Sequence, residues 1–344
     1  MKVIVVHAAK DLRLEDRKRP EPSSGQVLLR MQAGGICGSD LHYYQHGGFG
    51  AVQLKEPMIL GHEVSGIIEK VGPDVTELQV GQLVAVSPSR PCYKCEYCHI
   101  GNHNHCLKMQ FYGSAMPFPH IQGAFREWLV VDVNQCAVAD GLTAAEAAMA
   151  EPLSVVLHAA RNAGDLLGKR ILVTGCGPIG MLAVLIARAA GAAQIVATDI
   201  QDFTINMAGM LGADEVHNVT NHPSALLKYS GDKGHFDVLF ECTGLGAVVS
   251  STIAALRPGA TMMQLGFGGD MTLPMQAMTA KELVLKGSFR FHAEFFTAVS
   301  LMRKGRLDVK PVVTHSMPLD NLNAAFDLAS DRSQAVKVQL NFAP

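Results

Sequence analysis

The sequence predicts a two-domain α/β protein, with a mostly β domain followed by a parallel sheet wound with helices. Short β-like runs separated by Gly, Pro and polar turns fill residues 1–133, whereas strand and helix patterns alternate between residues 170 and 287. That alternation is typical of a doubly wound sheet. A chain of 344 residues is also long enough for two domains with separate cores.

The composition is that of an ordinary globular protein, with 48% hydrophobic and 17% charged residues. A formal net charge of -2 gives no basic surface for nucleic acid or for an anionic membrane. Residues 1–6 form a short strand-like run that does not resemble a targeting signal, and the apolar run 181–187 is far too short to cross a bilayer. We therefore expect a cytoplasmic protein with neither a nucleic-acid nor a membrane partner.

In the first domain, glycine-rich and proline-rich turns separate β-like runs at residues 27–32, 64–71 and 83–86. Ala-rich stretches at 143–150 and 153–163 predict helices that lead into the second domain. There, strands and helices are expected in alternation at residues 170–174, 179–190, 194–198, 203–211, 236–241, 247–256, 260–265 and 282–287.

The last segment predicts a helix at 295–304, a strand at 312–317, a helix at 319–329 and a strand at 336–342. We expect these elements to return to the first domain. The predicted domains are therefore residues 1–152 together with 289–344, and an inserted domain of residues 153–288. The cleft between two such domains is the expected place for a substrate.

The inserted domain begins with a pattern that predicts dinucleotide binding. The strand at residues 170–174 runs directly into Gly175, Gly177 and Gly180, which fit G-x-G-x-x-G. The first glycine permits a tight turn, the second lets the backbone approach a pyrophosphate, and the third lets helix and strand pack closely. The strand, the glycines and the unbroken helical pattern after them favour this interpretation over a mere glycine-rich turn.

Asp199 predicts the choice of cofactor. It ends the second strand of the inserted domain, at about the 20-residue separation where a carboxylate meets the adenosine ribose. Residues 200–206 contain no Arg or Lys that would offset this charge beside a 2′-phosphate. NAD is therefore the expected cofactor, with NADP as the alternative.

Four cysteines on one loop predict a structural zinc site. Cys92, Cys95 and Cys98 follow one another at C-x-x-C spacing, and Cys106 comes shortly after them. Four thiolates fill every position of a tetrahedral zinc ion and stabilise a loop that buries little apolar surface. A redox or regulatory thiol cluster is the alternative, although a reactive dithiol needs only two cysteines.

A second, open metal site is predicted from residues that lie far apart in the sequence: Cys37, His62, Glu63 and Glu151. Taken alone, Cys37 reads as a small core residue and His62 as a hydrogen-bonded turn histidine. Together the residues suit a zinc site with three protein ligands and one exchangeable position. Ser39 and His42 follow Cys37 closely and are candidates to carry a substrate proton to solvent, or simply to form hydrogen bonds.

Over essentially its full length, the chain resembles the zinc-dependent medium-chain dehydrogenases. Five segments carry the resemblance, in the order and spacing of that family: GGICGSDLHYY, GHEVSGIIEKVG, the loop from Cys92 to Cys106, AEPLSV and VTGCGPIG. Glu151 in AEPLSV is similar to the polyol dehydrogenases, which carry Glu where alcohol dehydrogenases carry a second cysteine ligand. FYGSAMPFPH and GSFRFHAEFFTAVS resemble dehydrogenases of sugar acids.

The resemblance implies a GroES-like catalytic domain, an inserted Rossmann domain, two zinc ions per chain and a homo-oligomer, either a tetramer or a dimer. It makes Cys37, His62 and one or both of Glu63 and Glu151 the catalytic zinc shell, and Ser39 with His42 the proton relay. We expect Glu151 to lie close to the metal, with Glu63 as the competitor. The cofactor-binding residues that we expect are Gly175, Gly177, Pro178, Ile179, Gly180, Asp199, Thr243, Leu265, Gly266 and Ser288.

The implied reaction is the reversible oxidation of a secondary alcohol, with hydride transfer to the nicotinamide. The resemblance of FYGSAMPFPH and GSFRFHAEFFTAVS implies a sugar acid as the substrate, and Arg290 is the expected partner of its carboxylate, through two parallel hydrogen bonds. The residues expected at the substrate are Tyr43, Phe111, Glu151, Arg290 and Phe291, with His120, Arg126 and His292 as other candidate cations.

Three alternatives stand beside this expectation. Polyol dehydrogenases that act on neutral sugars resemble the chain at Arg290 too, so a neutral polyol is the alternative substrate. A non-catalytic zinc-binding protein on the same scaffold, or a zinc-free reductase, would need no open metal site. The joint presence of the four candidate ligands argues against both of these classes.

Overall fold

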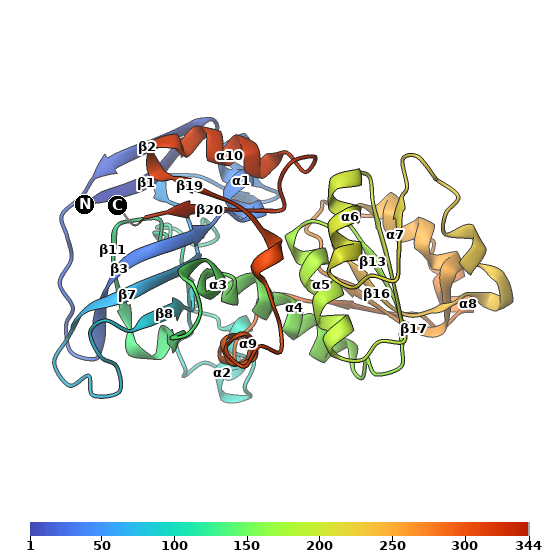
Figure 1. Ribbon diagram of the computed structural model, residues 1–344, viewed down its shortest axis with the longest axis horizontal. Helices are drawn as coiled ribbons and strands as arrows, with labels where there is room; N and C mark the ends of the chain where they lie inside the picture. Colours follow the sequence, from blue (N-terminus) through green and yellow to red (C-terminus); the bar gives the residue numbers. More distant parts are fainter. Residues whose placement is uncertain (343–344) are drawn as a thin grey trace. The chain divides into compact units, whose positions relative to one another are not determined.

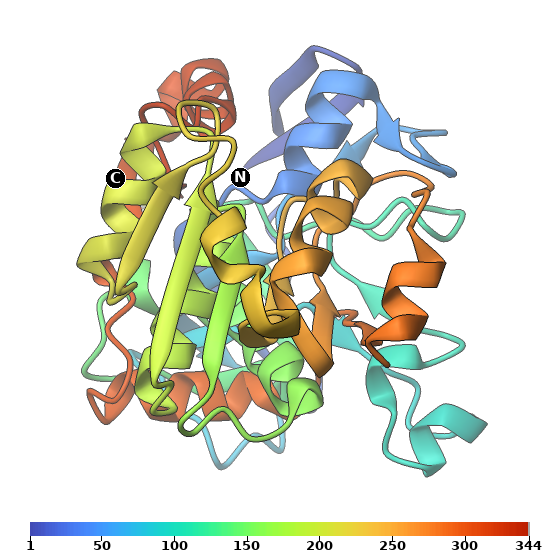
Figure 2. The ribbon, with the colours of Figure 1, turned by 90° about the vertical axis from the view of Figure 1, so that its right-hand side faces the viewer.

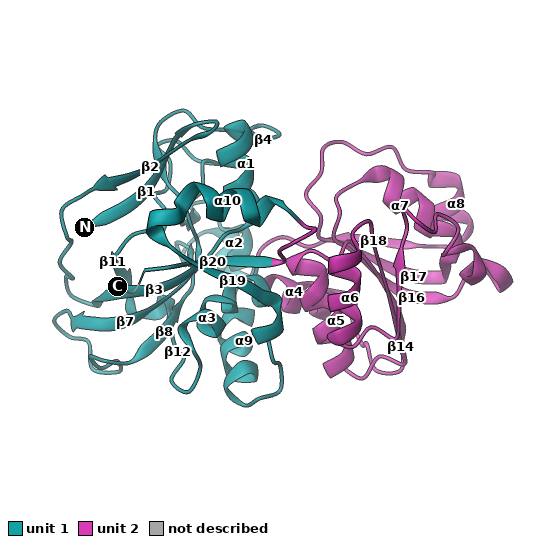
Figure 3. Ribbon diagram, turned by 45° about the horizontal axis from the view of Figure 1, so that its top comes forward, with its two compact units in different colours: residues 1–154, 291–331, 337–344 teal, residues 155–290, 332–336 magenta. Residues whose placement is uncertain are grey.

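The computed structural model describes residues 1–342, and it divides into two compact units (Figure 3). The first unit contains Met1–Ser154, Phe291–Asp331 and residues 337–342, and the second contains Val155–Arg290 and Arg332–Val336. The chain leaves the first unit after residue 154 and returns to it after residue 290. Residues 332–336 group with the second unit, although the sequence assigned them to the first.

The main sheet of the first unit has seven strands in the order β12-β8-β7-β3-β20-β19, and β11 also pairs with β3 (Figure 1). Hydrophobic residues such as Val27, Leu29 and Val84 are fully buried and make this sheet part of the core. The bounds are Gln26–Gly35 (β3), Glu63–Val71 (β7), Leu83–Val86 (β8), Trp128–Asp132 (β11), Cys136–Val138 (β12), Val313–Pro318 (β19) and Lys337–Asn341 (β20).

The pairing register brings the ends of three strands of this sheet together. Gly35, the last residue of β3, is opposite Glu63, the first residue of β7. On the other side of β3, Gln339 of β20 is also opposite Gly35. Residues near positions 36, 62 and 337 therefore meet at one edge of the sheet, although they are far apart in the sequence.

The first unit also contains a three-stranded sheet, β2-β1-β6, and the strand pairs β4-β5 and β10-β9. Their bounds are Lys2–Ala8 (β1), Asp11–Asp16 (β2), Gly48–Phe49 (β4), Val52–Gln53 (β5), Met58–Ile59 (β6), Ser89–Arg90 (β9) and Gln110–Phe111 (β10). The helices of this unit are Gly38–His46 (α1), Glu96–His99 (α2), Ala144–Ala148 (α3), Glu294–Arg303 (α9) and Leu322–Ser330 (α10), and the short 3-10 helices are His103–His105, Val133–Gln135, Lys310–Val312 and Leu319–Asn321.

Helix α1 fixes the position of Cys37, its N-cap residue. The carboxylate of Asp40 accepts a hydrogen bond from the backbone N–H of Cys37 at 3.0 Å, which satisfies a donor at the helix start. The helix ends at Gly47, whose left-handed φ of 72° is a common helix termination. Cys37 is thereby held between the end of β3 and the first turn of α1.

The second unit contains a six-stranded parallel sheet in the order β15-β14-β13-β16-β17-β18, seen side by side in Figure 2. The strands are Arg170–Thr174 (β13), Gln194–Asp199 (β14), Glu215–Asn218 (β15), Phe236–Glu241 (β16), Leu256–Gln264 (β17) and Val284–Gly287 (β18). The helices are Pro178–Ala189 (α5), Asp202–Met210 (α6), Gly246–Thr252 (α7) and Met275–Ala280 (α8), with 3-10 helices at Leu227–Tyr229, Gly231–Lys233 and Ile253–Ala255; helix α4, Ala150–Ala163, spans the boundary of the two units.

This strand order is that of the Rossmann fold, so the predicted doubly wound sheet is confirmed. The order reverses between β13 and β16, where such folds bind their ligand at the carboxyl ends of the strands. A hydrophobic cluster covers one face of the sheet and includes Leu172, Val196, Leu239, Val249 of α7 and Met278 of α8.

The sequence did not predict β15. Its four residues, Glu215–Asn218, are mostly polar and only partly buried at the edge of the sheet, so they lack a hydrophobic strand pattern. Among residues 1–342, no helix combines the length and the apolar character needed to cross a membrane.

Candidate active site

Cys37, His62 and Glu63 form a compact group in the first unit. One ligand atom from each residue lies within 4.8 Å of the other two. Cys37 comes from the junction of β3 and α1, whereas His62 and Glu63 stand at the start of β7. His62 and Glu63 are only 5% and 1% exposed, whereas Cys37 is partly exposed, so solvent reaches the group only on the side of Cys37.

The donor set fits a zinc ion, which binds thiolate, imidazole and carboxylate ligands. Within residues 1–342, the buried Nδ1 atom of His62 has no hydrogen-bond partner, and Oδ1 of Asp40 lies 3.9 Å from it. Burial and, to a smaller extent, the charge of Glu63 together raise the pKa of the Cys37 thiol to about 11. A bound cation would favour the thiolate form, because metal binding and thiol deprotonation are coupled.

Glu151, in the first turn of α4, lies close enough to this group to interact with its charges. Burial raises the pKa of Glu151 to about 8; the charges of Glu63 and Cys37 add to this shift, and His62 opposes it. Glu151 is 5% exposed, but it is not a member of the group of three ligand atoms described for residues 1–342. The geometry therefore favours Glu63 over Glu151 as the third ligand.

Two residues that the sequence analysis missed organise this group. Asp40 is fully buried and accepts hydrogen bonds from the backbone N–H groups of Cys37 and Gly61, at 3.0 and 3.1 Å. Its spacing from Cys37 is that of a helix cap, which is the one local signal that could have identified it. The second residue, Lys337, contacts Glu63 from the far end of the chain, and no local pattern marks it.

Four residues that the sequence analysis expected at the site lie on helix α1 or beside His62. Ser39 and His42 are both in α1, where residues three apart share one helix face. The ring of Phe111 lies 5.6 Å from that of His62, between centroids, so Phe111 forms a wall of the group. Tyr43 is buried, and its hydroxyl oxygen accepts a hydrogen bond from the backbone N–H of Ala115 at 3.0 Å.

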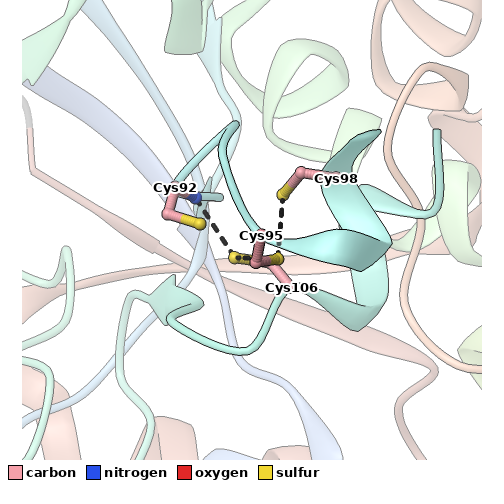
Figure 4. A group of neighbouring side chains, drawn as sticks. All are labelled: Cys92, Cys95, Cys98 and Cys106. Carbon is pink, nitrogen blue, oxygen red and sulfur yellow. Dashed lines mark hydrogen bonds between the residues drawn. The ribbon is translucent and has the colours of Figure 1, made fainter. Parts of the chain in front are cut away.

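The four cysteines of the loop, Cys92, Cys95, Cys98 and Cys106, converge as expected for a metal site (Figure 4). The sulfur of Cys95 is 3.5 Å from that of Cys98 and 3.9 Å from that of Cys106. These separations exceed the ~2.05 Å of a disulfide. They match the edge of about 3.8 Å in a tetrahedron with Zn–S bonds of about 2.3 Å.

The cysteines of this loop differ in their electrostatics. A hydrogen bond from the backbone N–H of Leu107 lowers the pKa of Cys95 to about 6, which favours the thiolate, whereas burial raises the pKa of Cys98 to about 12. The backbone N–H of Cys92 donates to the sulfur of Cys106 at 3.1 Å. Together these contacts arrange four sulfur ligands around one point, which is the arrangement of a closed zinc site.

The glycine turn of the second unit fits a dinucleotide. Gly175 has a left-handed φ of 82°, and Gly177 is the N-cap residue of α5, with Pro178 in the first turn and Ile179 after it. Among the described residues other than its chain neighbours, none has an atom within 4 Å of a Cβ built on Gly177, so the backbone is open to an approaching phosphate. The start of α5 thus presents the cradle that a pyrophosphate requires.

Asp199 closes this turn from the neighbouring strand. One of its oxygens, Oδ2, accepts a hydrogen bond from the backbone N–H of Cys176 at 2.6 Å. The other, Oδ1, accepts from the N–H groups of Ile200 and Gln201 at 2.7 and 3.0 Å. Asp199 is therefore fixed beside the glycine turn, at the end of β14.

The other expected cofactor residues follow the carboxyl ends of neighbouring strands: Thr243 after β16, Leu265 and Gly266 after β17, and Ser288 after β18. Glu241, which the sequence analysis missed, organises them. Its buried carboxylate accepts hydrogen bonds from the N–H groups of Thr243 and Gly244 and from the side chain of Gln264, at 2.8, 2.9 and 2.6 Å. The sequence signal that could have identified Glu241 is an acidic residue at the end of a central, apolar strand.

The two expected substrate residues at the start of the GSFRFHAEF segment differ in their surroundings. Arg290 belongs to the second unit; it has a left-handed φ of 55°, and its guanidinium lies 4.8 Å from the centre of the Phe289 ring. A non-glycine residue in this region is uncommon and often functional. Phe291 belongs to the first unit, is fully buried and stacks on Phe295, so its place at a substrate stays a prediction.

The other candidate cations are engaged elsewhere in the first unit. His120 accepts from the N–H of Lys55 at 2.8 Å, and its second ring nitrogen is 2.9 Å from the carbonyl oxygen of Pro117. Arg126 lines a cavity of about 310 Å³ whose lining does not include the Cys37 group. Burial lowers the pKa of His292, which favours its neutral form.

Comparison with known proteins agrees with these two sites. The family profile "alcohol dehydrogenase GroES-like domain" matches residues 23–140, and "zinc-binding dehydrogenase" matches residues 178–304. The chain is 43% identical over 321 residues to L-idonate 5-dehydrogenase (NAD(P)(+)) of Escherichia coli (strain K12), with 92% of each chain covered. It is 39% identical over 346 residues to the sorbitol dehydrogenase of Gallus gallus, covering 99% of this chain and 96% of that relative.

A solved structure leads to the same family. The crystal structure of L-idonate 5-dehydrogenase from Escherichia coli str. K-12 substr. MG1655 matches with a TM-score of 0.94 and 40% identity, covering 99% of this chain and 97% of the other. These matches confirm the expected GroES-like domain, and the sheet order agrees with the expected Rossmann domain. The protein belongs to the zinc-dependent medium-chain dehydrogenases, oxidoreductases that act on CH–OH donors.

Proposed function

We propose that the protein catalyses the reversible, NAD-linked oxidation of L-idonate at C5 to 5-keto-D-gluconate. The observation that carries the proposal is the compact group of Cys37, His62 and Glu63, which a zinc-free reductase or a purely structural zinc protein would not need. The substrate follows from the relative named L-idonate 5-dehydrogenase. The similarity to sorbitol dehydrogenase supports a neutral polyol as the alternative.

Zinc bound by these three residues would supply Lewis-acid polarisation of the substrate hydroxyl. The chain itself would move the proton, from the substrate hydroxyl to Ser39 and on to His42. Partial burial and the neighbouring His46 lower the pKa of His42, which favours the neutral form that accepts a proton. Glu151, buried beside the group, would hold a water molecule or the substrate in position.

We propose NAD rather than NADP as the preferred cofactor. Asp199 places a carboxylate beside the glycine turn, where it suits a ribose hydroxyl and repels a 2′-phosphate. The relative's name, with NAD(P)(+), leaves both cofactors open for that protein. Steady-state kinetics with each cofactor test the choice, and a higher kcat/KM with NADP would contradict it.

The substrate is tested with a panel of L-idonate, other aldonates, sorbitol and L-iditol, measured by nicotinamide absorbance. We expect the highest kcat/KM for L-idonate and about two zinc ions per chain. A kcat/KM for a neutral polyol well above that for idonate would overturn the acid assignment and leave the zinc and nucleotide chemistry intact. A single zinc per chain would instead contradict the catalytic site.

We further propose that the protein forms a homo-oligomer and works in the cytoplasm. Strand β18 ends the described sheet, and all four of its residues are exposed, including Val284 and Leu285 at 42% and 43%. Such an edge can pair with the same strand of a second copy. Light scattering gives the molar mass in solution of the wild type and of Leu285→Lys, which tests this interface. The cytoplasmic location is supported by the eight cysteines, which form no disulfide among the described residues and therefore suit a reducing compartment.

A further inference from the structure

A fully buried lysine contacts the candidate metal ligand Glu63. Lys337, the first residue of β20, is 2% exposed. Its ammonium nitrogen lies 2.7 Å from each carboxylate oxygen of Glu63 and 3.1 Å from the carbonyl oxygen of Ile36. An ammonium has three N–H donors, and these three acceptors match them.

Glu63 is also confined from the opposite strand. A Cβ built on Gly35 would lie 2.1 Å from Oε2 of Glu63, so only glycine leaves room for the carboxylate at this position. Gly35 is opposite Glu63 in the sheet, and Gln339, close to Lys337, is opposite Gly35. The register of β7, β3 and β20 therefore places the carboxylate and the ammonium against each other.

The charges around this pair are mostly acidic. Cys37, Asp40 and Glu151 are titratable acids near Glu63, and His62 is the neighbouring base. The ammonium group of Lys337 thus lies in a site that otherwise collects acidic side chains.

We propose that Lys337 is the internal counter-ion of the catalytic metal site. It holds the Glu63 carboxylate in place in the metal-free protein, so the site is assembled before a metal enters. Because its positive charge lies beside the metal position, it also weakens metal binding. Lys337 is a positioning residue that acts through Glu63, and the inference rests on the proposed metal site.

The two roles are linked by a thermodynamic cycle. Without Lys337, the metal-free protein carries a buried carboxylate that has lost its cation, which is strongly destabilising. A bound zinc ion would compensate that carboxylate, so the metal-loaded protein loses less stability. Folding and zinc binding of the wild type and the variant form a closed cycle. If the variant loses more folding free energy without zinc than with zinc, the difference must therefore appear as tighter zinc binding.

The test compares Lys337→Met with wild type and with Lys337→Arg, which keeps the charge. Partial chelation removes the weaker zinc, and the zinc content per chain is measured at each step. Competition with a chromophoric chelator then gives the zinc affinity of the catalytic site, and the Tm is measured with and without that zinc. We expect Lys337→Met to lower the Tm mainly in the metal-free form and to bind zinc at least tenfold more tightly, whereas Lys337→Arg stays near wild type.

The double variant Lys337→Met/Glu63→Gln is the matched control. In the Glu63→Gln background the carboxylate charge is gone. Adding Lys337→Met to it should therefore no longer enlarge the difference in Tm between the zinc-bound and the zinc-free protein. The inference is overturned if Lys337→Met lowers the Tm equally with and without zinc, or if its zinc binding is unchanged or weaker. Either result would show that Lys337 has a merely structural role. If Lys337→Met does not fold without zinc, refolding with added zinc must rescue it, and failure of that rescue also counts against the inference.

Failure of the proposed function has a different signature. Glu63→Gln with an unchanged zinc affinity would remove Glu63 from the ligand set. A wild-type protein that holds only the zinc of the four-cysteine loop would remove the catalytic site altogether. Neither result depends on Lys337, so the two failures are distinguishable.

Discussion

A Cβ atom on Gly180 would lie 1.8 Å from the carbonyl oxygen of Gly175. The first turn of α5 therefore packs directly on the end of the glycine turn, and no side chain fits between them. Gly180→Ala must displace the backbone, at a cost of about 1–3 kcal/mol. Thermal unfolding of the purified variant should give a clearly lower Tm than the wild type.

Gly177→Ala is the matched control for Gly180→Ala. Apart from the chain neighbours, no atom of residues 1–342 lies within 4 Å of the added Cβ, and the backbone φ of -67° suits alanine, so the Tm should stay close to wild type. The methyl group would instead occupy the space expected for the pyrophosphate, and NAD binding should weaken roughly tenfold or more. An unchanged NAD affinity, measured by calorimetry, would contradict the assignment of this turn.

The loop of Cys92, Cys95, Cys98 and Cys106 should lose one zinc ion per chain when Cys95 or Cys98 is replaced by Ala. A structural zinc contributes folding free energy directly, so the Tm should fall, by about 5–10 °C. Elemental analysis and thermal unfolding check both outcomes. Full zinc content in Cys95→Ala would favour the alternative thiol-cluster interpretation.

Cys37→Ala should abolish turnover, by roughly a thousandfold or more, because it removes the thiolate of the open site. The second unit does not contain this residue, so NAD binding should persist. Activity assays and cofactor titration separate the two effects. Near-normal activity with full metal content would show that the catalytic site lies elsewhere.

Glu63→Gln and Glu151→Gln rank the two carboxylates. We expect Glu63→Gln to weaken zinc binding more, because its oxygen belongs to the group within 4.8 Å, and Glu151→Gln to act mainly on kcat. Zinc affinity of both variants, alongside kcat, decides between them. Equal and negligible changes in affinity would exclude both as ligands.

Arg290→Ala should reduce kcat/KM roughly tenfold more for L-idonate than for sorbitol, because only the acid has a carboxylate to bind. Arg290→Lys keeps the charge but loses the paired hydrogen bonds, so it should have an intermediate effect. Equal losses for both substrates would show that Arg290 does not recognise the acid group.

Features that depend on short segments were predictable from the sequence. The spacing of Gly175, Gly177 and Gly180 encodes a turn and a helix start that need no distant partner, and the structure has both. The four cysteines lie on one loop, so their spacing alone brings the sulfurs together. The alternation of strands and helices likewise identified the parallel sheet, apart from the polar edge strand β15.

The catalytic group was only partly predictable. The resemblance to the family identified Cys37, His62, Glu63 and Glu151 as candidates, but it could not rank the two carboxylates. That ranking depends on where β7 and α4 place each side chain, and only Glu63 joins the group with Cys37 and His62. Asp40 was missed because a buried helix cap and an exposed one look the same in a sequence.

Only the tertiary structure decided the partner of Glu63. Nothing near Lys337 in the sequence marks it as buried, and lysine is rarely buried unless it is paired. The register of β20 against β3 brings its ammonium 2.7 Å from a carboxylate on β7. Such a pairing depends on long-range strand contacts, because each strand specifies its own buried face but not the distant residue that its side chains will meet.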